Sequence, residues 1–167
     1  MPEMPIAELP EGVYSETFKV ESSDIDVLEH VNNRVYLRWI EEVATNHSAK
    51  KGYDAKRYLE IGCVWVAREH WIEYLRPCVL GDTVTVYTWV EALDENRCLR
   101  RYAMTKAAGK LVCTAATEWD FINCATKRRT AVPEALKTAF KLIPAGDGRL
   151  KALGIGRALR YQSDLAT

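Results

Sequence analysis

Asp26 and His30 stand four residues apart in a polar stretch that leads into a helix-like pattern. The carboxamides of Asn32 and Asn33 follow at once. A helix start offers backbone N–H groups without intrahelical acceptors and the positive end of the helix dipole. A carboxylate, an imidazole and amides in one place are the parts needed to polarise a carbonyl group and attack it. We therefore treat residues 24–33 as the candidate reactive segment.

The elements that must position these residues are a short strand before them and a long helix after them. Alternating side chains predict a strand over 13–20, and apolar residues at helical spacing predict a helix from about 33 to 51. Four more strands and a second helix are expected at 63–76, 83–92, 97–106, 111–123 and 133–142. Because one long helix cannot bury its apolar face alone, this order predicts an α+β fold with a curved antiparallel sheet wrapped around the helix.

Length and composition restrict the class of protein. The chain has 167 residues, of which 48% are hydrophobic and 28% charged, which fits a single domain with a real core. We expect that domain over 1–143 and a loosely packed, glycine-containing tail over 144–167. The 23 basic residues balance the 23 acidic ones, so nucleic acid is not an expected partner. No apolar run is long enough to predict a membrane span.

Cysteine usage and the N-terminal residues bear on the compartment. The five cysteines include no CxxC pair, which favours a reduced, cytoplasmic protein without a disulfide framework. No Cys/His spacing resembles a set of metal ligands, so neither a metal nor another cofactor is expected. Residues 1–12 lack the basic start and the apolar stretch of a signal peptide.

The reactive segment and a later strand carry a resemblance to a known family. Residues 24–36 resemble the signature of hot-dog-fold thioesterases. Their sequence is Asp24-Ile25-Asp26-Val27-Leu28-Glu29-His30-Val31-Asn32-Asn33-Arg34-Val35-Tyr36. The similarity is greatest to the acyl carrier protein (ACP) thioesterases of plants and their bacterial relatives, and extends to the 4-hydroxybenzoyl-CoA thioesterases. The family's second strand and turn are similar to Trp71-Ile72-Glu73-Tyr74-Leu75-Arg76-Pro77 with Gly81-Asp82. The resemblance covers about residues 14–133.

This resemblance implies a hot-dog fold, in which a curved sheet embraces one central helix, and hydrolysis of a thioester carried by CoA or ACP. It places the family's catalytic Asp on Asp26, a His on His30 and a strand carboxylate on Glu73. It also implies a homodimer or homotetramer with the site at the subunit interface. The chain has Leu28 and Glu29 where the two branches have Asn and Gly, so the acyl preference stays open.

Thioester hydrolysis needs a base or nucleophile, stabilisation of charge on the carbonyl oxygen, and a held substrate. Asp26 is a candidate nucleophile or general base, and its plainer interpretation is a loop or capping residue. His30 is a candidate to orient Asp26 or assist a proton transfer, and otherwise it is structural. The N–H groups of Val31, Asn32 and Asn33 are the candidate oxyanion hole, at what is otherwise an ordinary capped helix end.

Two further candidates lie outside this segment. Alternation along its strand predicts that Glu73 shares a side with Trp65, Ala67 and Trp71. There it is either a base that positions water or a group turned outward at an edge. The compact basic cluster Lys127-Arg128-Arg129 is a candidate for binding the phosphates of CoA or phosphopantetheine, and otherwise is solvated surface.

Three functions are compatible with this pattern. The first is an enzyme that hydrolyses acyl-CoA or acyl-ACP to the free acid and thiol. The second is a non-catalytic hot-dog protein that binds an acyl thioester. The third is a hydratase or dehydratase acting on the same carriers, which would place its His and Asp differently. The presence of Asp26, His30 and Glu73 together favours the first.

Overall fold

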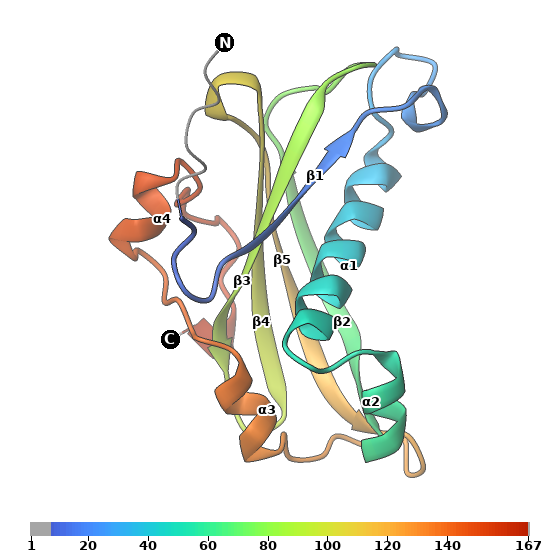
Figure 1. Cartoon of the computed structure of the whole chain (residues 1–167), viewed down its shortest axis with the longest axis vertical. Helices are drawn as coiled ribbons and strands as arrows, with labels where there is room; N and C mark the ends of the chain where they lie inside the picture. Colours follow the sequence, from blue (N-terminus) through green and yellow to red (C-terminus); the bar gives the residue numbers. More distant parts are fainter. Residues whose placement is uncertain (1–7, 167) are drawn as a thin grey trace.

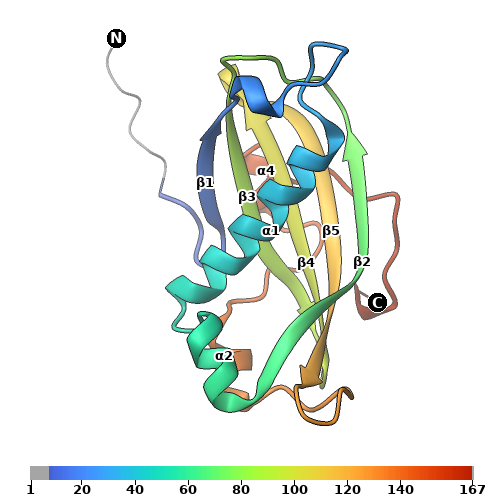
Figure 2. The same cartoon turned by 90° about the vertical axis from the view of Figure 1, so that its right-hand side faces the viewer.

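One antiparallel sheet curves around a long helix in the computed structural model, which describes residues 8–166 (Figures 1 and 2). The sheet has five strands in the order β1-β3-β4-β5-β2. Their bounds are β1 Tyr14–Lys19, β2 Cys63–Tyr74, β3 Thr83–Leu93, β4 Arg97–Lys106 and β5 Lys110–Asn123. β2 therefore forms the edge opposite β1, although it follows β1 in the sequence.

The connection between these two edges contains the long helix α1 (Asn33–Lys50), which lies on the inner face of the sheet (Figure 2). Its apolar residues recur at helical spacing, and Tyr36, Ile40 and Val43 are buried toward the sheet. The side chain of Asn32 accepts a hydrogen bond from the Arg34 N–H at 3.0 Å and caps the helix. The predicted α+β arrangement is confirmed.

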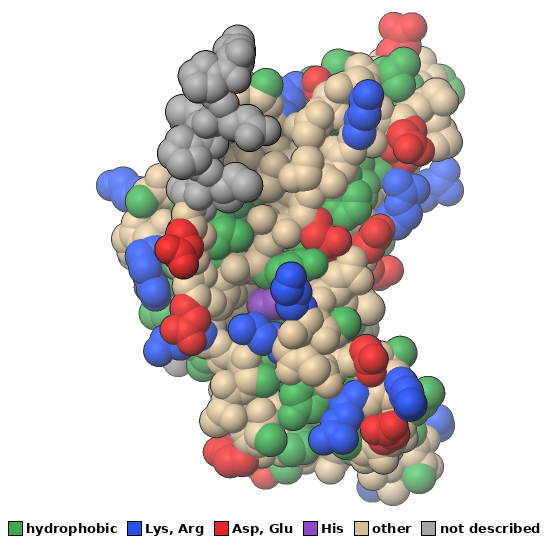
Figure 3. Space-filling model, viewed as in Figure 1, with side chains coloured by type: hydrophobic (Ala, Val, Ile, Leu, Met, Phe, Trp, Pro, Cys, Tyr) green, Lys and Arg blue, Asp and Glu red, His purple; other side chains and the backbone are tan. Residues whose placement is uncertain are grey.

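Shorter helices complete the chain. Their bounds are α2 Ala55–Ile61, α3 Glu134–Ala139 and α4 Gly148–Ala152, with 3-10 turns η1 Ser22–Asp24, η2 Ala107–Gly109 and η3 Asp164–Ala166. Within residues 8–166, no helix has both the length and the apolar character that a membrane crossing requires. Figure 3 shows acidic and basic side chains interspersed over the face it draws, in line with the balanced charge of the sequence.

The C-terminal tail packs on the outer face of the sheet. Ile155 and Leu150 are only 0% and 3% exposed, and they form a buried cluster with Trp89 and Ala103 of the sheet. The prediction of a loosely packed tail over 144–167 is therefore wrong for its described part. The glycines of the tail suggested mobility, but the apolar residues between them cover an apolar sheet face that would otherwise meet water.

β2 carries one extra residue relative to its neighbour β5. Ala67 is paired with Trp119, and Glu69 is paired with the adjacent Glu118, so Arg68 has no partner of its own. A β-bulge of this kind shifts the alternation of all side chains that follow it by one residue. Side chains of β2 before and after the bulge therefore obey opposite alternations.

The bulge places Glu73 on the outer face of the sheet. Trp65, before the bulge, points to the α1 side, whereas Trp71, after it, is stacked on Tyr161 of the tail with 6.5 Å between ring centroids. The prediction that Glu73 shares a side with Trp65 and Ala67 is wrong, because counting alternate residues through a bulge gives the opposite face.

Candidate active site

Asp26 and His30 lie at the two ends of a tight turn that closes just before α1. The Asp26 N–H donates to the His30 carbonyl at 3.0 Å, and the Glu29 N–H donates to the Asp26 carbonyl at 3.0 Å. Glu29 has a φ of 61°, a left-handed conformation that few non-glycine residues adopt. Oδ1 of Asp26 accepts from the Leu28 N–H at 2.9 Å, which orients the carboxylate. Its other oxygen makes no hydrogen bond within residues 8–166.

The tip of this turn is open to solvent. His30 is exposed, and its ring forms no hydrogen bond or ion pair with the part of the chain that the structure describes. Val27 and Leu28 are 94% and 71% exposed. An open carboxylate oxygen, an unpartnered imidazole and two exposed apolar side chains thus lie within five consecutive residues.

An ion pair between a buried carboxylate and an exposed arginine anchors the turn to α1. Asp24 is 3% exposed, and its Oδ1 accepts from the Arg38 guanidinium of α1 at 2.9 Å. Its Oδ2 accepts from the Glu21 N–H at 3.0 Å. Asp24 therefore has a structural role, whereas Asp26 keeps an open oxygen.

The backbone amides at the start of α1 differ in whether they are already bonded. The Val31 N–H donates to the Cys78 carbonyl at 2.9 Å, and the Asn32 N–H donates to the Asp24 carbonyl at 2.8 Å. The prediction of an oxyanion hole is therefore wrong for Val31 and Asn32, because a donor that is already bonded cannot receive a substrate oxygen. The Asn33 N–H has no backbone or side-chain acceptor within the described chain.

Glu73 does not join Asp26 and His30. Its carboxylate accepts from Arg157 Nε at 2.8 Å and from Arg160 Nε at 3.2 Å, and both arginines belong to the tail on the outer face. The Glu73 side chain is only 12% exposed in these contacts. Within one chain it holds the tail and does not face the reactive turn.

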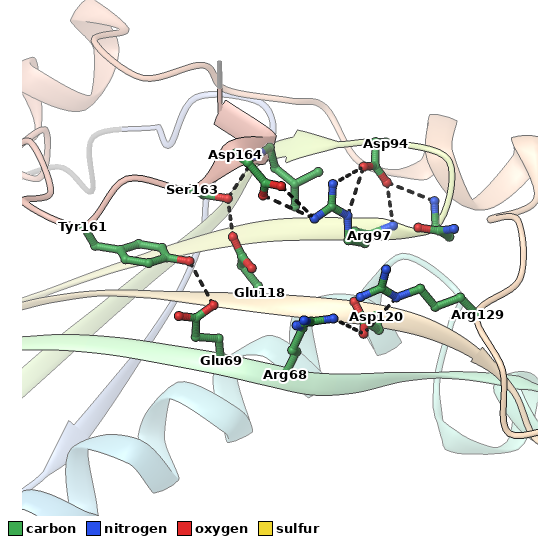
Figure 4. A network of polar contacts seen from close by, with 12 residues as sticks. Arg68, Glu69, Asp94, Arg97, Glu118, Asp120, Arg129, Tyr161, Ser163 and Asp164 are labelled. Atoms are coloured by element: carbon green, nitrogen blue, oxygen red, sulfur yellow. Dashed lines mark hydrogen bonds and ion pairs between the residues drawn. The ribbon is translucent and has the colours of Figure 1, made fainter.

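More polar contacts fasten the same tail (Figure 4). The Tyr161 hydroxyl donates to Glu69 at 3.2 Å, and the Ser163 hydroxyl donates to the buried Glu118. Figure 4 shows these side chains reaching from the tail to β2 and β5 across the outer face. Carboxylates of that face therefore bind the tail.

A cavity of about 330 Å³ opens on the inner face, between α1, α2 and the sheet. Its walls are mostly apolar and aromatic, and they include Ala44, Tyr58, Trp65, Trp119 and Phe140. Apolar walls with a few placed polar groups are typical of sites for small molecules. Ala44 lies 11 residues beyond Asn33 along α1, so the cavity is roughly 16 Å along the helix axis from the reactive turn.

Arg100 of β4 lines this cavity and contacts a buried histidine of α1. Its Nη1 donates to His47 Nδ1 at 2.9 Å and to the Thr88 hydroxyl at 3.1 Å. Burial, and then the charge of Arg100, lower the pKa of His47 to about 3. The imidazole is therefore neutral at pH 7 and accepts through Nδ1, because a guanidinium can only donate.

Sequence reasoning did not select Arg100, although a signal exists. The inner-facing positions of β4 read Cys98, Arg100, Tyr102 and Met104, so a permanent cation stands at an alternation position that is otherwise buried and uncharged. A charged residue on the core side of a strand is rare unless it is paired.

The basic cluster at 127–129 lies at the cavity end of the molecule. It follows β5, beside the end of α2, where the Cys124 N–H donates to the Gly62 carbonyl at 2.9 Å. Arg129 is already in an ion pair with Asp120 at 3.1 Å. Within one chain the cluster is therefore far from Asp26 and close to the opening beside α2.

Comparison with known proteins places these features in a family. A family model described as the acyl-ACP thioesterase N-terminal domain matches residues 11–140. The chain belongs to this family. A chloroplastic palmitoyl-ACP thioesterase of Gossypium hirsutum is 24% identical over 132 residues, covering 75% of this chain and 32% of that protein. The chain thus spans about a third of the length of such plant relatives. The long-chain acyl-CoA thioesterase FadM of Escherichia coli is 26% identical over 121 residues, covering 71% of this chain and 90% of FadM.

Solved structures agree with the family's fold. A Staphylococcus aureus protein in complex with CoA has a TM-score of 0.73 at 21% identity, covering 93% of this chain and 92% of that one. A 1,4-dihydroxy-2-naphthoyl-CoA thioesterase from Synechocystis has a TM-score of 0.71 at 18% identity, covering 77% of this chain and 95% of that one. The sheet around α1 is therefore the expected hot-dog fold, and the resemblance drawn from the reactive segment is confirmed.

Proposed function

We propose that the protein hydrolyses the thioester bond of an acyl-CoA or acyl-ACP. The observation that carries this proposal is an Asp26 carboxylate with an open oxygen in the turn that leads to the open Asn33 N–H. Such a pair supplies a base and an oxyanion donor, the two groups that acyl transfer needs. Relatives named as thioesterases of acyl-ACP and of acyl-CoA support both carriers.

In this proposal Asp26 takes a proton from water while the water oxygen attacks the thioester carbonyl carbon. The carbonyl oxygen becomes negative and accepts a hydrogen bond from the Asn33 N–H, aided by the dipole of α1. Collapse of the intermediate re-forms the carbonyl and breaks the C–S bond. The proton held by Asp26, or relayed by His30, goes to the departing sulfur, so the products are the acid and the thiol.

Direct attack by Asp26 is the alternative route, through an acyl-aspartyl anhydride that water then cleaves. A single turnover in H₂¹⁸O separates the two routes. If water attacks the thioester, ¹⁸O enters only the released acid. If Asp26 attacks, hydrolysis of the anhydride at the aspartyl carbonyl leaves ¹⁸O in the protein.

Two copies of the chain complete each site in this proposal. β2 runs antiparallel to α1: its Tyr74 end meets the start of α1, where the Tyr74 hydroxyl donates to the Asn33 carbonyl at 3.2 Å. Its other end borders the cavity through Trp65. β2 is also a sheet edge, and antiparallel two-fold pairing of β2 with β2 of a second copy is an available way to cover it. That pairing brings the reactive turn of one copy to the cavity and the basic cluster of the other.

Release of free thiol from a panel of acyl-CoA and acyl-ACP substrates tests the function. Wild type should cleave at least one substrate, and Asp26→Asn should lower kcat/KM about 10²- to 10⁴-fold with unchanged melting temperature. If wild type binds acyl thioesters but releases no thiol from any, the protein is the non-catalytic binder instead.

A further inference from the structure

The inner-face cavity contains a cation at its wall. Arg100 is the charged residue among the described residues that line the cavity, and the rest of the lining is apolar, aromatic or hydroxyl-bearing. A guanidinium stays protonated at any ordinary pH, so burial cannot neutralise it. The Arg100 side chain therefore brings a permanent positive charge to an otherwise uncharged space.

This charge has no carboxylate partner within residues 8–166. Arg100 is 6% exposed and uses Nη1 for the neutral His47 and for Thr88. The adjacent Arg101 shows the contrast: it is 5% exposed on the other face and pairs with Glu91 at 3.0 Å. The guanidinium carbon lies 5.6 Å from the centre of the Phe140 ring, but no carboxylate among the described residues pairs with the charge. Because a buried charge without a counter-ion is costly, an anion would stabilise Arg100.

A second donor at the same wall, the Trp119 indole, is poorly satisfied. The indole Nε1 of Trp119 is buried without a hydrogen-bond partner, and Trp119 lines the cavity. Tyr102, two residues beyond Arg100 on the same side of β4, brings its hydroxyl close to the Trp119 and Thr117 side chains. Buried polar atoms in folded proteins nearly always have partners. At this wall Arg100 therefore lacks a counter-charge, and the Trp119 indole makes no hydrogen bond of normal geometry.

We propose that the cavity receives an acyl group whose far end carries a carboxylate, which Arg100 and Trp119 bind. This inference rests on the proposed function, since it treats the ligand as the acyl part of a thioester. The apolar and aromatic walls accommodate the methylene chain, and the carboxylate supplies the counter-charge and the acceptor that the wall lacks. A methyl-terminated chain would leave the guanidinium unpaired, so the cavity selects for the carboxylate-terminated one.

Equilibrium binding with a matched pair of probes tests the proposal without any hydrolysis. The probes are the monomethyl and dimethyl esters of the same α,ω-dicarboxylic acid, over a series of chain lengths, followed by tryptophan fluorescence or calorimetry on the full chain. The two esters differ only in one carboxylate. Wild type should bind the monomethyl ester about 10- to 100-fold more tightly, the range of one charge-assisted contact.

Variants then assign the preference to residues. Arg100→Gln should abolish it, Arg100→Lys should retain part of it, and Trp119→Phe should weaken it while keeping the aromatic wall. Arg68→Gln is the matched control, because Arg68 is a strand arginine with a side chain 57% exposed and is not part of the cavity lining. If Arg100→Gln does not fold, the proposal is still tested by the affinities of wild type for the two esters and by the loss of preference in Trp119→Phe.

Equal binding of both esters by wild type, or a preference unchanged in Arg100→Gln, would overturn the proposal. So would failure of wild type to bind either ester. Any of these binding results could occur while the protein still releases thiol from methyl-terminated acyl-CoA. In that case the proposed hydrolysis stands and only the carboxylate subsite is rejected. Loss of thiol release from every substrate, with the monomethyl ester still preferred, would reject hydrolysis and retain the subsite.

Discussion

Arg157 donates to the carboxylate of Glu73 over 2.8 Å, and this contact ties the C-terminal tail to the outer face of β2. Glu73 therefore faces away from α1 and from the turn that holds Asp26. A carboxylate that the family resemblance assigns to catalysis thus has a structural partner in this chain.

Glu73→Gln should loosen the tail and leave hydrolysis nearly intact. Loss of the charged acceptor for Arg157 and Arg160 should cost about 1–3 kcal/mol of stability. Hydrogen exchange should accelerate in the tail around residues 157–163, while kcat/KM changes less than about tenfold, well below the usual effect of losing a general base. Asp26→Asn is the reciprocal control, with lost activity and an unchanged tail. A large loss of activity in Glu73→Gln with normal tail exchange would restore Glu73 to the reaction.

Asn33→Pro should remove the proposed oxyanion donor without breaking α1. Asn33 is the first residue of the helix, where proline is tolerated because it fixes a helical φ and needs no acceptor. The preceding Asn32 has φ −60° and ψ 138°, a conformation compatible with a following proline. We expect kcat to fall about 10²- to 10³-fold, as for other single oxyanion donors.

Asn33→Ala is the control for that experiment, since it keeps the backbone N–H and changes only the side chain. Circular dichroism and thermal melting of both variants should match wild type. Equal activity of Asn33→Pro and Asn33→Ala would mean that this amide does not contact the substrate oxygen.

Two inactive variants should recover activity when mixed, if each site is shared by two copies. Asp26→Asn lacks the carboxylate, and Thr45→Trp fills the cavity from an exposed position of its lining. A mixed dimer has one site with both parts intact, so random mixing should restore roughly a quarter of wild-type activity. The measurement is thiol release after co-refolding, with a substrate that Thr45→Trp alone does not cleave. No recovery above the separate variants would place Asp26 and the cavity of the same chain in one site.

His47 should make stability fall as pH decreases from about 6.5 toward 3. Its pKa is about 3 in the folded protein and 6.5 in a model peptide, so between these values the unfolded chain binds the extra proton. Unfolding therefore becomes easier by up to about 1.4 kcal/mol per pH unit in that window. Above pH 6.5 the effect is absent, because the imidazole is neutral in both states.

His47→Gln isolates this contribution from the acidic groups, which it leaves in place. The difference in unfolding free energy between wild type and His47→Gln, measured by urea denaturation, should shrink as pH falls from 6.5 to 4. A difference that stays constant over this range would show that His47 is not held neutral by its burial.

Local periodicity in the sequence was sufficient to predict the long helix and the strands. The long helix was predicted over about 33–51 and spans Asn33–Lys50, and the strand at 97–106 has the predicted bounds. These features follow from residues close to one another in the chain, because apolar spacing and capping act over one or two turns. The same local pattern placed Asp26 just before the helix.

Contacts between distant residues decided the rest. The Val31 and Asn32 amides donate to the carbonyl groups of Cys78 and Asp24, and of the three candidate amides this leaves the Asn33 N–H open. The face of Glu73 depends on one unpaired residue at Arg68, and no local pattern announces it. The cavity, and Arg100 without a carboxylate beside it, exist only when α1, α2 and the inner sheet face are packed together. Sequence order therefore located the reactive turn, while tertiary packing determined which groups remain open to a substrate.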